Sequence, residues 1–297
     1  MVQVRHVRQI LKAYATIEGA GVRLHRAFGY GELPRFDPFL MLDDFRAGND
    51  PSDYVAGFPW HPHRGIETVT YMLEGQVEHG DSMGNSGIIG SGDVQWMTAG
   101  SGIIHQEMPK PVDGRMGGFQ LWANLPRTHK MMRPRYQEIG YGDVPLALPG
   151  PGVRIKVICG NAFGVTGSVK DIVTDPLYLD VAVDRGSSFN ITVNSQYTVA
   201  AYVIAGTGRF GEGGGATVGD RDMLLFGDGD LVSATAAGGT FRFLLLSGRP
   251  IREPVAWSGP IVMNSWEELK QAFLEYRNGT FIKHHGTKRP DTGEKPE

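Results

Sequence analysis

Two short segments of the sequence each carry metal-ligating side chains at alternate positions. His61 and His63 are separated by one proline, and His105 and Glu107 by one glutamine. Side chains alternate between the two faces of a β-strand, so each pair points to one face. Two such strands facing each other inside a barrel supply three imidazoles and one carboxylate, a set suited to a first-row transition metal with open coordination positions. We therefore predict a metal site where these two segments meet.

A second carboxylate competes for the fourth ligand position. Glu67 follows His61 and His63 at an even spacing, so in an uninterrupted strand all three side chains point to the same face. The residues alone do not choose between Glu67 and Glu107.

The regions around these residues predict short antiparallel strands. Glycine accounts for 42 of 297 residues, about 14% and roughly twice its ordinary share, without the three-residue period of collagen. A β-branched run at residues 66–73 ends before a glycine, and shorter runs follow at 77–79, 88–89 and 94–97. Strands this short and this regularly interrupted are typical of an antiparallel sandwich or barrel.

The length of the chain predicts two domains, because 297 residues are about twice the usual domain size. A proline- and glycine-rich passage at residues 126–152 has the composition of a linker, and strand-like runs resume after it. We expect an all-β fold of two tandem barrels, one in residues 1–140 and one in residues 141–285. Residues 286–297 are polar and contain proline and glycine, so we expect them to be disordered.

One helix is expected near the end of the second domain, at residues 265–277. Ser265 and Glu268 have the spacing of a capping box, in which each side chain caps the backbone N–H of the other residue. Trp266 and Leu269 begin an apolar stripe at helical spacing, which we expect to pack on a barrel.

Composition excludes several classes of protein. A net charge of -3 and a pI near 6.3 provide no basic field for nucleic acid or anionic lipid. The sequence has no apolar run of 18 residues, so we expect no membrane span. Cys159 is the single cysteine, which excludes a disulfide framework and suits a reducing compartment. We expect a cytoplasmic protein with no direct nucleic-acid or membrane partner.

Three further features are assigned structural roles. Residues 206–211 match G-x-G-x-x-G, but the glycine-rich stretch after them cannot begin the helix that a nucleotide site needs, so we expect a turn and no nucleotide. Cys159 lies in an apolar run and is expected in the core. His79 is expected at the surface or beside the metal ligands. Because no histidine lies between His129 and His284, we predict no metal in the second barrel.

The segments around the metal-ligating residues resemble a known family. They read FPWHPHRGIETV at residues 58–69, GSGIIHQEMP at residues 100–109 and QLWANLP at residues 120–126, with a later echo, GPIVMN, at residues 259–264. In these stretches the chain closely resembles the pirin family of the cupin superfamily. The resemblance implies two cupin barrels of the jelly-roll type in tandem, with a single metal ion, Fe2+ or another divalent transition metal, in the first.

The resemblance also implies the roles of individual residues. The pirin pattern assigns His61, His63, His105 and Glu107 as metal ligands, and so favours Glu107 over Glu67. Glu67 then becomes a candidate for orienting the imidazoles, because groups behind the ligands tune a metal site.

The activity that the resemblance implies is that of a quercetin 2,3-dioxygenase, an oxidoreductase that cleaves a flavonol with O2. Glu107 would also act as the catalytic base. Phe45, Phe58, Trp60 and Trp122 lie close to the motifs and are expected to line a pocket for a small aromatic substrate. The alternative is a redox-sensing iron protein without turnover that binds and regulates a protein partner, either a transcription factor or a metabolic enzyme. A third option is a zinc-dependent isomerase of the cupin class.

Overall fold

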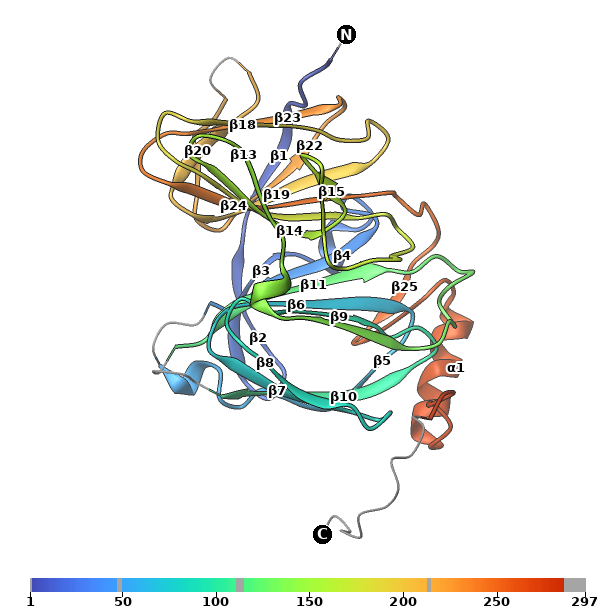
Figure 1. The fold of residues 1–297 in the computed structure, drawn as a ribbon. Helices are drawn as coiled ribbons and strands as arrows, with labels where there is room; N and C mark the ends of the chain where they lie inside the picture. The colour runs from blue at the N-terminus through green and yellow to red at the C-terminus, as the bar shows by residue number, and fades with distance from the viewer. Residues whose placement is uncertain (1, 47–49, 111–114, 213–214, 286–297) are drawn as a thin grey trace.

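The computed structural model describes residues 2–46, 50–110, 115–212 and 215–285. Two β-barrels are stacked on each other, the first below the second in Figure 1, and α1 (Trp266–Arg277) lies beside the first barrel. The expected all-β fold, with two cupin barrels in tandem and one helix near the end, is confirmed. No helix within the described ranges is long and apolar enough to cross a membrane. The tail expected to be disordered, residues 286–297, lies outside these ranges.

The first barrel is formed by two antiparallel sheets. In spatial order, the larger sheet contains β12 (Arg135–Ile139), β9 (Val94–Thr98), β6 (Ile66–Glu74), β11 (Gly117–Asn124), β4 (Phe39–Asp44), β3 (Val22–Phe28) and β2 (Tyr14–Glu18). The smaller sheet contains β5 (Phe58–His63), β10 (Ile103–Lys110), β7 (Gln76–Asp81) and β8 (Ser86–Ile89). Both predicted metal-ligating segments therefore lie on neighbouring strands of the smaller sheet.

The second barrel repeats this arrangement. Its larger sheet contains β1 (Val7–Lys12), β22 (Asp222–Phe226), β19 (Thr198–Ala205), β24 (Phe241–Gly248), β17 (Leu177–Val183), β14 (Val153–Cys159) and β13 (Leu146–Gly150). Its smaller sheet contains β18 (Ser188–Thr192), β23 (Leu231–Ala236), β20 (Thr207–Phe210) and β21 (Val218–Gly219), and a short hairpin joins β15 (Asn161–Ala162) to β16 (Val165–Thr166). Each barrel thus contains one sheet of seven strands and one of four, and the larger sheets differ in chain order only at one edge, where β12 and β1 occupy the same place.

Segments from each end of the chain cross between the barrels. β1 precedes the first barrel in sequence but pairs with β22 of the second. After the second barrel, the hairpin of β25 (Ala256–Ser258) and β26 (Ile261–Met263) returns to the first, where Ile261 bridges to Arg64. The domain boundary expected near residue 140 stays a prediction. A single boundary does not describe these two segments, because each contacts the barrel formed by the other part of the chain.

The helix begins and is capped as the sequence predicts. The Ser265 hydroxyl accepts a hydrogen bond from the backbone N–H of Glu268, and the Glu268 carboxylate accepts one from the N–H of Ser265. Leu269 and Ala272 are buried, but 61% of Trp266 is exposed, so its expected burial is wrong. Residues three apart drift by about 60° around a helix, so Trp266 leaves the face that Ala272 buries.

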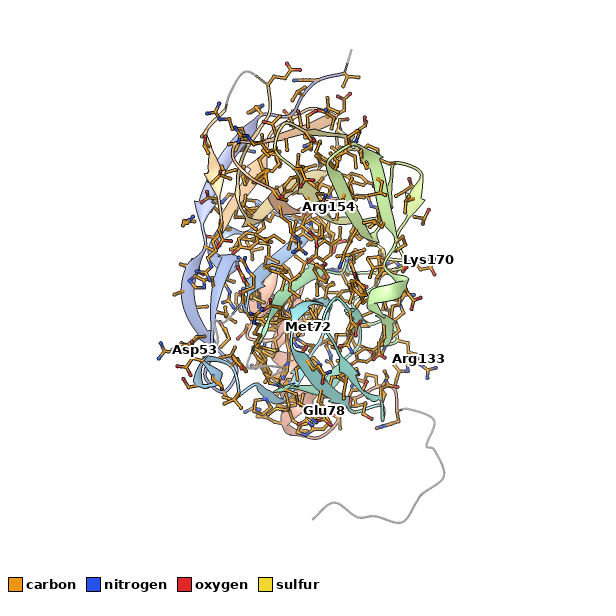
Figure 2. All side chains as sticks on the ribbon, turned by 60° about the vertical axis from the view of Figure 1, so that its left-hand side comes forward. Asp53, Met72, Glu78, Arg133, Arg154 and Lys170 are labelled. Carbon is orange, nitrogen blue, oxygen red and sulfur yellow. The ribbon has the colours of Figure 1, made fainter. Side chains whose placement is uncertain are left out.

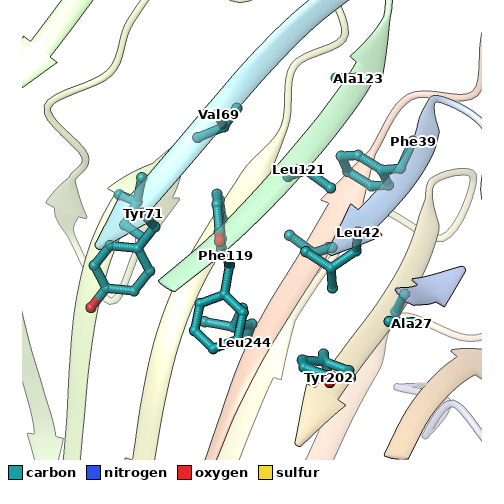
Figure 3. Close-up of a cluster of buried hydrophobic side chains, with 14 of the residues drawn as sticks. Ala27, Phe39, Leu42, Val69, Tyr71, Phe119, Leu121, Ala123, Tyr202 and Leu244 are labelled. Carbon is teal, nitrogen blue, oxygen red and sulfur yellow. The ribbon is translucent and has the colours of Figure 1, made fainter. Parts of the chain in front are cut away.

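A buried apolar cluster joins the two barrels. Val69, Phe119 and Leu121 of the first barrel pack against Tyr202 and Leu244 of the second (Figure 3). Cys159 belongs to the same cluster and is buried, as expected from its apolar surroundings in the sequence.

Two reciprocal hydrogen bonds cross this cluster. The Tyr71 hydroxyl donates to Asp180 of the second barrel at 2.7 Å, and the Tyr202 hydroxyl donates to Asp44 of the first barrel at 2.8 Å. Tyr71 lies on β6 and Tyr202 on β19, which occupy the same place in their sheets, and the aspartates lie on the equivalent strands β4 and β17. The pairs therefore align the two barrels residue by residue.

Replacing Tyr202 with phenylalanine is expected to destabilise the fold by about 1.5 to 3 kcal/mol, because Asp44 is buried and loses a donor to a charged acceptor. Tyr71→Phe should have a similar effect through Asp180. Tyr141→Phe is the control, since 62% of Tyr141 is exposed and its change should stay within about 0.5 kcal/mol. Urea unfolding of the three variants measures this, and equal midpoints for Y202F and Y141F would contradict it.

Candidate metal centre

Three histidines meet inside the first barrel. His61 and His105 are partners in the pairing of β5 with β10, and His63 follows on the same face of β5. Their ligand nitrogens all lie within 4.8 Å of one another, and the Nε2 atoms of His61 and His63 are 3.0 Å apart. Prolines can occupy β5 because it is an edge strand of its sheet. The alternation predicted from the sequence thus brings the three imidazoles together.

Backbone carbonyls fix the orientation of two of these rings. His61 Nδ1 lies 2.8 Å from the Pro59 carbonyl oxygen, and His63 Nδ1 lies 3.1 Å from that of Pro260. A proton on each Nδ1 makes these contacts hydrogen bonds and leaves the Nε2 lone pairs directed at the other histidines. The Pro260 carbonyl comes from the returning β25–β26 hairpin, nearly 200 residues from His63 in the chain.

The third imidazole has the character of a metal ligand. His105 is buried, and neither of its ring nitrogens has a hydrogen-bond partner among the described residues. Buried polar groups are rarely left unpaired, so this ring fits a place beside a bound ion. Burial lowers the pKa of all three histidines, and the neighbouring imidazoles lower those of His63 and His105 further. Neutral imidazoles are the form that binds a metal.

Glu107 lies near the histidines but outside their closest group. A β-bulge between His105 and Glu107 shifts the register of β10 against β5, so Glu107 pairs with Phe58. The carboxylate is buried and accepts a hydrogen bond from the Thr70 hydroxyl at 3.1 Å, and burial raises the pKa of Glu107 to about 7. Glu107 and two of the histidines line the same cavity. Its role as the fourth ligand stays a prediction.

The structure does not bring Glu67 to the imidazoles. Gly65, at a φ of +78°, turns the chain between β5 and β6, so the alternation counted from His63 does not continue to Glu67. Glu67 shares a face of β6 with Val69 and Tyr71, towards the second barrel. Its carboxylate accepts a hydrogen bond from Thr98 at 2.7 Å. Glu67 therefore does not contact the space between the three imidazoles directly.

A cavity of about 770 Å³ opens beside the histidines. All four residues expected at a substrate pocket line it: Phe45, Phe58, Trp60 and Trp122. Phe45 is buried, whereas 53% of Trp60 is exposed at the surface. The sequence did not identify the contribution of the β25–β26 hairpin, which adds Trp257, Gly259 and Pro260 to the wall. The only sequence signal in this hairpin was the family-like segment GPIVMN at residues 259–264, which did not indicate where the hairpin packs.

His79 is a further buried polar residue that the sequence left undecided. It lies opposite Glu107 in the pairing of β7 with β10, and 2% of it is exposed. Its Nε2 is 2.9 Å from the Glu138 carboxylate, and its ring stacks on Tyr136. Gly87 makes room for this ring, since a Cβ at that position would lie 2.9 Å from His79 Nε2. His79 therefore lies behind the candidate ligands and not at the surface.

Fold and site together define a tandem cupin protein with a three-histidine group in its first barrel. The pirin family matches residues 21–123, and the pirin C-terminal cupin domain matches residues 178–282. The chain belongs to the pirin family.

Several known proteins are similar over nearly the whole chain. A pirin-like protein of Caulobacter vibrioides is 47% identical, covering 94% of this chain and 99% of the relative. Mouse pirin is 40% identical, covering 88% of each chain. The crystal structure of a quercetin 2,3-dioxygenase from Acinetobacter baumannii has a TM-score of 0.85 at 31% identity, covering 94% of this chain and 98% of that one.

Glu67→Gln is expected to stabilise the protein above neutral pH. Burial raises the pKa of Glu67 from 4.5 to about 7, so between these values the folded state holds a proton that the unfolded state releases. Wild-type stability therefore falls as the pH rises through this range, and glutamine, which keeps the acceptor for Thr98, does not titrate. The variant should be more stable by about 3 kcal/mol at pH 8 and equal to the wild type at pH 4.5.

Urea unfolding of both proteins at the two pH values measures this difference. Glu212→Gln is the matched control, because Glu212 is exposed and its replacement should leave the pH dependence unchanged. A stability difference for E67Q that is the same at pH 4.5 and pH 8 would show that burial does not raise the pKa of Glu67.

Proposed function

We propose that this protein is an iron-dependent dioxygenase that cleaves a flavonol such as quercetin with O2. The observation that carries the proposal is the group of three neutral imidazoles at the wall of a largely apolar cavity of about 770 Å³. This volume lies in the range of sites for small organic molecules. The similarity to a quercetin 2,3-dioxygenase of known structure supports the choice of substrate.

His61, His63 and His105 would hold the ion, with Glu107 as the fourth ligand. The donor set of imidazole and carboxylate suits Fe2+ and also accepts other divalent transition metals. A ferrous ion, if bound there, would supply Lewis-acid and redox chemistry for a reaction with O2. The carbonyls of Pro59 and Pro260 keep the Nε2 lone pairs of His61 and His63 available.

Glu107 is the group that would take the proton from the 3-hydroxyl of the flavonol. A general base must lie within hydrogen-bond reach of the proton that it takes, and the Glu107 carboxylate lines the cavity beside His61 and His63. The Thr70 hydroxyl, which donates to this carboxylate, orients it in the cavity. The side chains of Phe58, Trp60 and Trp122 offer flat apolar surfaces to the substrate rings.

Two other functions would use the same imidazoles. An iron protein that regulates a protein partner by binding would bind iron but would not consume O2 with a flavonol. A cupin isomerase would carry zinc. Elemental analysis of the purified protein and O2 uptake with quercetin therefore separate the three functions.

His61→Ala should lose the bound metal and at least 100-fold of the O2 uptake with quercetin, because it removes one of three imidazoles from the site. His285→Ala is the matched control, since this exposed histidine lies near the end of the described chain and should leave both quantities unchanged. Metal content is measured by elemental analysis and O2 uptake with an oxygen electrode.

Wild-type activity retained in the H61A variant would contradict the proposal. So would purified protein that carries iron but consumes no O2 with any flavonol, which favours the regulatory function. Zinc as the metal of the active protein would contradict both iron-based functions.

A further inference from the structure

An unbroken row of polar side chains crosses the larger sheet of the first barrel. The register pairs its members from one strand to the next, over β3, β4, β11, β6, β9 and β12: Arg26, Asp43, Gln120, Thr70, Gln95 and Glu138. Asp43, Thr70 and Gln95 are each 3% exposed. Burying so many polar groups costs free energy unless every one is hydrogen-bonded, so the row needs a reason beyond packing.

The second barrel shows that the fold does not require this row. The reciprocal bonds of Tyr71 and Tyr202 make these two tyrosines equivalent positions of the two barrels. Thr70 of the polar row precedes Tyr71 by one residue, so its equivalent is the residue before Tyr202, and the register of the second barrel gives the other members of this equivalent row. Its members are all apolar: Val157, Leu179, Leu245, Ala201, Leu224 and Ile10. All but Ile10 are buried. An apolar row thus packs well in the same architecture, and the polar row serves the cavity of the first barrel.

Four of the six residues of the polar row face this cavity. Arg26, Asp43, Gln120 and Thr70 line it. The Thr70 hydroxyl lies 2.7 Å from the Gln120 side-chain oxygen and 3.1 Å from Glu107, so this end of the row adjoins the candidate metal ligands. Three strand spacings separate β6 from β3, which places Arg26 about 14 Å along the sheet from Thr70. That distance suits a planar molecule of three aromatic rings.

Arg26 is held rigidly at the remote end but keeps free donors. Its Nε and Nη2 donate to the two carboxylate oxygens of Asp43 at 2.8 and 2.7 Å, and Nη2 also lies 2.8 Å from Glu18. Within the described ranges, Nη1 has no partner. Burial raises the pKa of Asp43 only to about 6, so Asp43 is ionised at neutral pH. One cation and two carboxylates leave this end with a net negative charge.

The charge selects among the groups that could bind there. A ligand carboxylate would accept from Arg26 but would also meet Asp43 and Glu18, so it is disfavoured. A neutral phenolic hydroxyl can accept from Nη1 and donate to a carboxylate oxygen at the same time. We propose that Arg26 and Asp43 form a subsite for a ring hydroxyl at the end of the polar row remote from Thr70 and Glu107. They would make the protein selective for hydroxylated flavonols over unsubstituted ones.

The experiment compares quercetin with 3-hydroxyflavone, which keeps the 3-hydroxyl but has no hydroxyl on its rings. With the metal-loaded wild type, kcat/KM for O2 uptake should be at least tenfold higher with quercetin, because a site built to hydrogen-bond a hydroxyl rejects the analogue without it. Arg26→Met should reduce this preference to less than threefold. Arg154→Met, which breaks an exposed pair with Asp184 on the second barrel, is the control and should keep the preference (Figure 2).

A second variant protects the test against misfolding. Arg26→Met alone leaves Asp43 buried without its cation, which destabilises the barrel. The double variant R26M/D43L removes both charges and copies Leu179, the equivalent residue of the second barrel. It should fold, shown by an unfolding midpoint close to that of the wild type, and should lose the preference for quercetin.

The choice of a flavonol as ligand for this subsite rests on the proposed function. A binding measurement without turnover tests the subsite separately from the proposed reaction. Trp60, Trp122 and Trp257 line the cavity, so ligand binding without O2 can be followed by quenching of their fluorescence. The ratio of the two dissociation constants should favour quercetin at least tenfold in the wild type and less than threefold in R26M/D43L. A double variant that keeps the wild-type ratio overturns the subsite, even if the wild type turns over both flavonols. If the wild type does not turn over either flavonol but R26M/D43L loses the binding preference for quercetin, the proposed dioxygenase function is overturned and the subsite is supported.

Discussion

The alternation of side chains in three neighbouring strands is the constraint on which the rest of the structure depends. β6, β11 and β4 separate the dry contact between the barrels from the cavity of the first barrel. Tyr71, Phe119 and Asp44 face the second barrel, whereas Thr70, Gln120 and Asp43, one residue away on each strand, face the cavity. A shift of one residue in any of these strands would exchange the two faces. The bonds of Tyr71 and Tyr202 across the contact hold this register, and so hold the walls of the cavity.

The sequence was sufficient for those features that depend on local spacing. The two-residue spacing within each pair placed His61, His63 and His105 on one face of β5 and β10, and the capping pattern located the start of α1. The expectation that the two strands face each other inside the barrel is wrong, because they pair side by side in the smaller sheet. Local spacing failed wherever the chain turned or returned from a distance. The prediction for Glu67 assumed a continuous strand that Gly65 interrupts. Neither the packing of Pro260 on His63 nor the polar row has a local signal, because both depend on pairings between strands far apart in the chain.

The two barrels show how one architecture serves two purposes. In the second, the space between the sheets is filled by phenylalanines, among them Phe210, Phe241 and Phe243, whose ring centroids lie 4.9 to 5.6 Å apart. Such aromatic contacts stabilise the interior of a barrel by close packing. In the first, polar residues and the histidines occupy the space. The second barrel therefore stabilises the fold by packing against the first. The first barrel can then keep a cavity lined by polar side chains, among them Arg26 with a donor that is free within the described part of the chain.

The return of the β25–β26 hairpin has a consequence for the order of biosynthesis. The carbonyl that orients His63 belongs to Pro260, so the strands carrying the three imidazoles leave the ribosome long before this acceptor is made. β1 is translated first, but its partner strand β22 is translated more than 200 residues later. The acceptor for His63 is thus present only when the chain has been translated past Pro260, and β1 is paired only when β22 has been translated. Orientation of the His63 imidazole is in this way coupled to completion of the chain, and a product truncated before Pro260 lacks the acceptor for His63 Nδ1.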